Sequence, residues 1–190
     1  MKSLLGLALF FLMTENSFGN DFSKFIQYGA GYYGSVYFHE VGHATAAKLG
    51  GASEIFIEIP GKNGNIFGGV THYLNSPKNN SEGFRQAVNL AGLVFGNAAS
   101  EFVIQKPGLH GNPFAQSIAS SAQIINLANV YRYYGRVRGV NGWNGNDIDR
   151  FEIDGGNPHI LSAVLVGYTL WSLKRMSKKS IPLYSINLKF

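Results

Sequence analysis

The chain of 190 residues contains no cysteine, and only 14% of its residues are charged. Without cysteine, disulfide bonds and thiolate-bound zinc are excluded, so any metal ion must be held by histidine and carboxylate groups. Ordinary soluble domains have about 25% charged residues. The net charge of +5 is spread along the chain, apart from the short run KRMSKK at 174–179. We therefore expect no nucleic-acid partner.

Long hydrophobic runs are also missing from the N-terminus. A short basic start is followed by ten apolar residues at 4–13 and by small residues near Ser17 and Gly19. Ten residues are too few to span a bilayer, and the pattern is typical of a secretory signal. We predict a signal peptide over 1–19, with an uncleaved anchor as the alternative. Residues 20–190 then form one domain of an exported periplasmic, cell-envelope or secreted protein.

The sequence H-E-V-G-H at 39–43 is the main functional signal. In one chain of this composition, about 0.005 occurrences of H-E-x-x-H are expected by chance. On a helix, His39 and His43 lie on the same face and can direct two imidazoles at one ion. Glu40 lies beside them, where it can take a proton from a metal-bound water. Two hydrogen-bonded core histidines are the alternative, but they leave Glu40 as an unexplained charge in an apolar stretch.

Hydrophobic periodicity and turn residues predict the remaining elements. Alternating residues at 55–59, turn residues at 61–64 and the stretch 65–73 predict a β-hairpin, whose edge strand could pair with an extended peptide. The tail 180–190 could add a short strand. The fold class is therefore mainly α with a small β-hairpin (α+β), and the motif makes its helical core zincin-like. The expected helices are 25–49, 84–105, 115–135 and 159–176.

A catalytic zinc ion needs a third protein ligand. The extended pattern H-E-x-x-H-x-x-G-x-x-H is absent, because position 46 is alanine and position 49 is leucine. The other histidines are expected at the surface or in hydrogen bonds (His72, His110, His159). The candidates are therefore later acids. They are Glu101 in the second long helix and a cluster that follows the third (Asp147, Asp149, Asp154).

The order of HEVGHA, EIFIEIPG…GGVTHY, NLAGLVFGNAASEF and GNDIDRF resembles the protease domain of the membrane-anchored FtsH-type zinc proteases. The resemblance covers residues 36–151, and HEVGHA is its specific part. It implies that His39 and His43 are ligands, that Glu40 is the base and that Asp147 is the third ligand. This chain has no G-x-x-x-x-G-K-[ST] motif for an ATPase, and it has an additional helix at 115–135.

HEVGHATAAKLGG, AGLVFGN and IDGGNPH are also similar to segments of the site-2 type intramembrane metalloproteases. This second resemblance implies Asp154 as the third ligand. Here Ile153 stands where that family has leucine, and the N-P-x-P sequence before the motif is missing.

These observations predict a zinc metalloprotease that acts on peptide or protein substrates with Zn²⁺ as its cofactor. His39, His43 and Asp147 are the predicted metal ligands, and Glu40 is the general base. The alternatives are a non-catalytic metal-binding protein and a structural envelope protein. Membrane association stays open for 86–105 and 159–173, because Tyr168, Trp171 and KRMSKK resemble interfacial anchors and a glycine-rich soluble core explains both stretches as well.

Overall fold

The computed structural model describes residues 20–59, 68–74, 80–135 and 146–183. Its described part is mainly helical with a two-stranded sheet, which confirms the predicted fold class. The elements in chain order are α2 (Asn20–Leu49), β1 (Ser53–Glu58), β2 (Val70–Leu74), α3 (Glu82–Gln105), the short 3-10 helix η2 (Pro107–Leu109), α4 (Pro113–Tyr134), α5 (Asp147–Ile153) and α6 (Pro158–Lys178).

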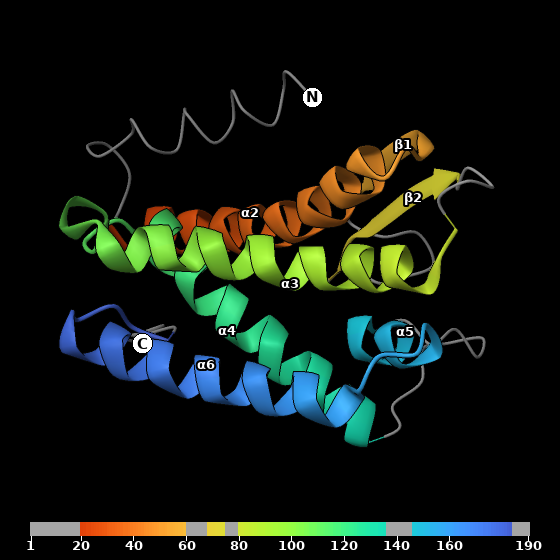
Figure 1. Ribbon diagram of the computed structural model, residues 1–190. Helices are drawn as coiled ribbons and strands as arrows, with labels where there is room; N and C mark the ends of the chain where they lie inside the picture. The colour runs from red at the N-terminus through yellow and green to blue at the C-terminus, as the bar shows by residue number, and fades with distance from the viewer. Residues whose placement is uncertain (1–19, 60–67, 75–79, 136–145, 184–190) are drawn as a thin grey trace.

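The long helices form two layers that are joined by α4. Helices α2 and α3 lie side by side, and α4 crosses from them toward α6 (Figure 1). Helix α4 packs against α2, α3 and α6, so it is central to the bundle. The short helix α5 packs against α3, α4 and α6, at the same end of the molecule as the two strands. This arrangement brings residues that follow α4 close to the end of α2.

Polar side chains set the starts of the helices. Each of four N-cap residues accepts hydrogen bonds from free backbone N–H groups of the first turn, which would otherwise have no partner. Proline occupies an early position in α4 and α6, where a backbone N–H group would have no partner within the helix and its absence costs nothing. The caps are Ser81 for α3, Asn112 for α4, Asn146 for α5 and Asn157 for α6.

The two strands pair antiparallel, with Ile57 opposite Thr71. The predicted returning strand began at residue 65, but β2 begins at Val70 and ends at Leu74. Gly68 and Gly69 are not in a strand. A side chain at Gly69 would meet Glu40, with only 2.6 Å between its Cβ and Glu40 Cγ. Glycine therefore lets this segment approach α2 before pairing starts.

No secondary structure was predicted for 147–158, where the structure has α5 and the start of α6. Helix α5 has only seven residues, too few for hydrophobic periodicity to reveal it. Ile148 is fully buried and packs with Leu93 of α3 and Leu165 of α6, so tertiary contacts stabilise this helix. The predicted signal peptide (1–19), the predicted turn at 61–64, most of the loop after α4 (136–145) and the end of the tail (184–190) lie outside the described residues.

Candidate metal centre

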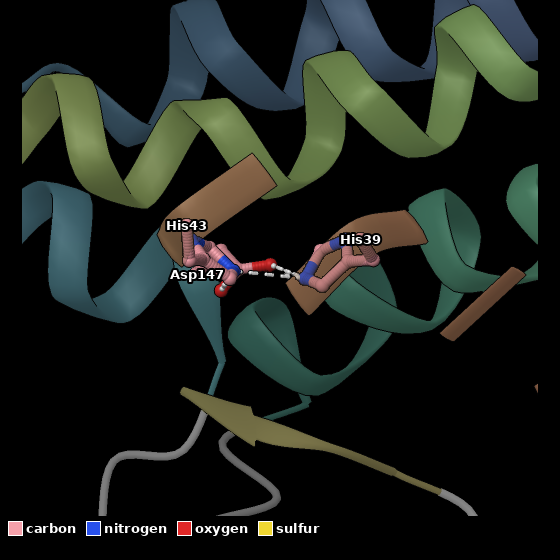
Figure 2. A group of neighbouring side chains, drawn as sticks. All are labelled: His39, His43 and Asp147. Carbon is pink, nitrogen blue, oxygen red and sulfur yellow. Dashed lines mark hydrogen bonds and ion pairs between the residues drawn. The ribbon is translucent and has the colours of Figure 1, made fainter. Parts of the chain in front are cut away.

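Three side chains from two distant parts of the chain meet at one point (Figure 2). Asp147 Oδ2 lies 3.0 Å from His39 Nε2, and Asp147 Oδ1 lies 3.4 Å from His43 Nε2. The two Nε2 atoms are 3.0 Å apart. In the described part of the chain, this is the one group of histidine and acidic side chains whose potential ligand atoms gather closely enough to hold a metal ion.

The orientation of His43 is fixed by its other ring nitrogen. His43 Nδ1 lies 2.7 Å from the backbone oxygen of Val88 on α3. A carbonyl oxygen only accepts hydrogen bonds, so Nδ1 carries a proton and Nε2 is the ring nitrogen that faces the cluster. Metal-binding histidines are commonly held in this way by a second hydrogen bond, which fixes both the tautomer and the ring orientation.

Glycine residues of α3 leave room for the histidine rings where α3 packs against α2. A Cβ added at Gly92 would lie 2.2 Å from His43 Nε2. One turn later on the same helix, a Cβ at Gly96 would lie 3.9 Å from the nearest atoms of His39, which is an ordinary contact distance. Gly92 is therefore required by the position of the imidazole, whereas Gly96 has room for a methyl group.

Asp147 is held in place by the start of α5. Asn146 caps the helix by accepting hydrogen bonds from Ile148 N and Asp149 N. Asn129 of α4 holds the same end, because its Oδ1 accepts a hydrogen bond from Asp147 N and its backbone oxygen accepts one from Asn146 Nδ2. The first residue of α5 is thus fixed to α4 through its backbone, and its carboxylate is free to face the histidines.

Asp154 anchors the opposite end of α5. Its carboxylate accepts a hydrogen bond from Arg85 Nε at 2.5 Å and one from Asn89 Nδ2 at 2.8 Å. Its backbone oxygen accepts a third from Gln86 Nε2. All three donors belong to α3, the helix that also orients His43. Asp154 therefore fixes α5 relative to the histidines and does not join the cluster itself.

The geometry fits a tetrahedral metal ion. Zinc–ligand distances of about 2.0–2.2 Å place two tetrahedral donor atoms about 3.4 Å apart. The two Nε2 atoms are 3.0 Å apart, and each lies 3.0 or 3.4 Å from one of the two Asp147 carboxylate oxygens, which is close to that spacing. The donors are two imidazoles and one carboxylate, a set that leaves a coordination position for water. We conclude that the group can bind a metal ion.

The electrostatics keep the carboxylate ionised. Burial by itself would raise the pKa of Asp147, but the adjacent His39 and His43 lower it well below its usual range. Metal ligands must be deprotonated to bind. The Asp147 carboxylate is therefore ready to bind a cation at any pH near neutrality.

Glu40 is buried beside the cluster and is held by the hairpin. Thr71 Oγ1 of β2 lies 2.7 Å from Glu40 Oε2 and 3.0 Å from the Glu40 backbone oxygen. Both are acceptors, so the single hydroxyl proton of Thr71 is directed to Glu40. The other carboxylate oxygen, Oε1, faces Gly69. The hairpin therefore covers the glutamate of the motif with one hydrogen bond and one glycine.

The structure places the remaining candidates elsewhere. Glu101 forms two hydrogen bonds of 2.7 Å with the Arg175 guanidinium, and Asp149 lies outside the cluster. The three other histidines have different contacts, as expected from the sequence. His72 stacks on Phe56, His110 bonds to the backbone oxygen of Ile104, and His159 bonds to Tyr134.

Sequence reasoning missed the residues that support the cluster. Asn129, Thr71 and Gly92 are far from the motif in sequence, and a Val88 backbone oxygen leaves no sequence signal at all. Gly92 has a partial sequence signal, because it lies among other small residues of α3, a composition that suits close packing against another helix. The supporting role of Asp154 was hidden because it was considered only as a ligand.

Comparison of the chain with models of known protein families, with curated proteins and with solved structures gave no match. The centre is therefore defined by its motif and by the geometry of its residues.

Substituting Gly92 with alanine should abolish tight metal binding, because the new methyl group would displace the His43 ring. The matched change Gly96→Ala, one turn away on the same helix, should leave metal content unchanged. Metal analysis of both purified variants, with circular dichroism as a check on folding, measures the difference. Equal metal content in the two variants would contradict the proposed position of His43.

Removing the anchor at Asp154 should weaken metal binding without removing a ligand. We expect Asp154→Ala to lower affinity by about 10–100-fold, the usual effect of losing an outer partner of a metal site. The absorption spectrum of bound Co²⁺ at saturation should match that of the wild-type protein. Glu101→Ala breaks the other arginine–carboxylate pair of α3 and should leave affinity unchanged. Complete loss of binding in Asp154→Ala alone, even at high Co²⁺, would contradict a purely anchoring role.

Proposed function

We propose that the protein is a zinc metalloendopeptidase. The observation that carries this proposal is the convergence of His39 and His43 on the Asp147 carboxylate, with Glu40 of the same H-E-x-x-H motif buried alongside. A metal-binding role alone would need the three ligands but would not need the glutamate. An isolated buried carboxylate is costly, so its presence next to the cluster favours a chemical role.

When bound, zinc would supply an electrophile that polarises the scissile carbonyl and makes a water molecule more acidic. The chain provides the other groups. Glu40 would accept the proton of the attacking water and transfer it to the departing amine. Thr71 donates a hydrogen bond to Oε2 of this carboxylate and fixes its orientation. His43, held by Val88, and Asp147, held by Asn129, would keep the ligand geometry constant during the reaction.

The hairpin is the element best placed to hold a substrate. Among the described residues, β2 pairs with β1 on one edge and with no other strand. A peptide in extended conformation could add to its open edge, with backbone hydrogen bonds giving affinity for many sequences. Because Thr71 of this strand contacts Glu40, a peptide on that edge would lie close to the proposed base.

Two imidazoles and one carboxylate can also bind other first-row transition metals. A non-catalytic metal-binding protein is therefore the alternative function. Hydrolysis is distinguished from it by the role of Glu40, which is not needed for binding.

The isosteric change Glu40→Gln should preserve bound zinc and lower the rate of peptide cleavage by at least about 100-fold, the usual contribution of a general base. His39→Ala should lose both zinc and cleavage. Zinc content is measured by elemental analysis, and cleavage by mass spectrometry of peptide libraries incubated with zinc-loaded protein.

His159→Ala serves as the matched control, because this histidine lies at the exposed start of α6, bonds to Tyr134 and lies outside the cluster. It should keep normal zinc content and normal cleavage. Undiminished cleavage by Glu40→Gln would rule out the proposed base. Zinc-loaded wild-type protein that cleaves no peptide in the libraries would instead favour the non-catalytic alternative.

A further inference from the structure

The last helix, α6, has the reverse of the polarity expected in water. Its buried face includes Ser162, Thr169 and Ser172, and the last two have no exposed surface. Its outer face carries Ile160, Val164, Leu170 and Trp171, whose exposed fractions range from 52 to 63%. A helix on the surface of a water-soluble protein has polar residues outside and apolar residues inside.

Helix α4 has the same reversal. Its inner face includes six buried polar residues, and its outer face carries the exposed residues Ile124, Leu127 and Tyr131. Helix α3 adds exposed Val94, Phe95 and Phe102. The buried polar residues of α4 are Ser117, Ser120, Ser121, Gln123, Asn126 and Asn129.

Several of the buried polar residues form hydrogen bonds to one another across the helices. Asn126 exchanges hydrogen bonds with Asn97 of α3 and donates another to Thr169 of α6. Gln123 donates to Ser100, which in turn donates to the backbone oxygen of Ala119. Small and hydrogen-bonding residues at helix contacts are the pattern by which helices associate when their surroundings are as apolar as their outer faces.

Charged residues lie at the two ends of this apolar region and define two levels along α3. At one end of α3, Arg85 pairs with Asp154, and at the other end Glu101 pairs with Arg175. The two levels are sixteen residues apart on α3, which corresponds to about 24 Å at 1.5 Å per residue. Between them α3 has no Asp, Glu, Lys or Arg, α4 has none before Arg132, and α6 has none before Lys174. The hydrocarbon core of a bilayer is about 30 Å thick.

The C-terminal end of α6 has the composition of a membrane interface. Trp171 and Tyr168 are followed by the basic residues Lys174, Arg175, Lys178 and Lys179. The Arg175 guanidinium lies 4.2 Å from the centre of the Trp171 ring. Aromatic residues concentrate at the headgroup level, and lysine and arginine bind anionic lipid headgroups.

We infer that the outer faces of α3, α4 and α6 contact the acyl chains of a lipid bilayer, with the basic end of α6 at anionic headgroups. Overall hydropathy identifies only α3 as long and apolar enough to cross a membrane among the described helices. The serine, asparagine and glutamine side chains that lower the hydropathy of α4 are the ones that point inward. This inference uses no residue of the metal centre, and it holds whether or not the protein is an enzyme.

Spin labels on single cysteines test this inference, and the chain has no native cysteine to interfere. Val164→Cys and Leu127→Cys place labels on the outer faces, and Lys178→Cys places one beyond the basic boundary. The full chain is reconstituted in vesicles of phosphatidylcholine and phosphatidylglycerol. Collision of each label with oxygen, which concentrates in lipid, is compared with collision with a water-soluble nickel chelate. We expect the oxygen-to-nickel ratio at 164 and 127 to exceed that at 178 several-fold.

Ser162→Cys, on the buried face of α6, is the matched control and should be shielded from both reagents. Nickel accessibility at 164 and 127 equal to that at 178 would overturn the inference and indicate a water-exposed surface. Labels at 164 and 127 that are shielded from both oxygen and nickel would overturn it in favour of a protein partner, which includes a second copy of this chain. Circular dichroism of each labelled variant confirms that its helical content matches the wild type.

Discussion

Two imidazoles and a carboxylate meet inside this protein, where few water molecules can stabilise their charges. Such a group is stable only if its charges compensate one another or if a cation binds between them. Asp147 is held ionised by the two histidines, and a hydrogen bond to another element fixes both His43 and Asp147. The packing of α2 against α3 and the docking of α5 against both α3 and α4 are the structural conditions for this contact. The rest of the site, including Glu40 and the hairpin, is arranged around it.

The helices of the bundle also pack with polar residues inside, and these residues need hydrogen-bond partners. Reciprocal amide bonds join Asn97 and Asn126, Gln123 donates to Ser100, and Ser117 and Ser120 donate to backbone oxygens. Hydrogen bonds of this kind depend on direction, so they select one helix arrangement more strictly than apolar contacts do. Asn129 belongs to this polar face of α4 and also holds Asp147. The inner face of α4 thus links the packing of the bundle to the geometry of the metal centre.

The sequence was sufficient to predict the four long helices, the hairpin and two histidines of the centre, because these depend on local patterns. His39 and His43 are one turn apart on the same helix, and Gly50-Gly51 ends that helix. Asp147 followed only from the resemblance to a protease family, because its position depends on the docking of α5. That docking depends on Ile148, Asn129 and Asp154, which come together through tertiary contacts. Asp147, Asp149 and Asp154 lie close together in the sequence, so spacing could not decide which of them is the third donor.

The origin of Asp147 late in the chain has a consequence for biosynthesis. Its helix docks on α3, α4 and α6 at once, because Ile148 contacts Leu93 and Leu165 and Asn146 contacts Asn129. During translation, the two histidines leave the ribosome long before these docking surfaces exist. A nascent chain can therefore offer only two of the three donors, and it holds a metal ion weakly. Completion of the centre is therefore delayed until the last helix has been made.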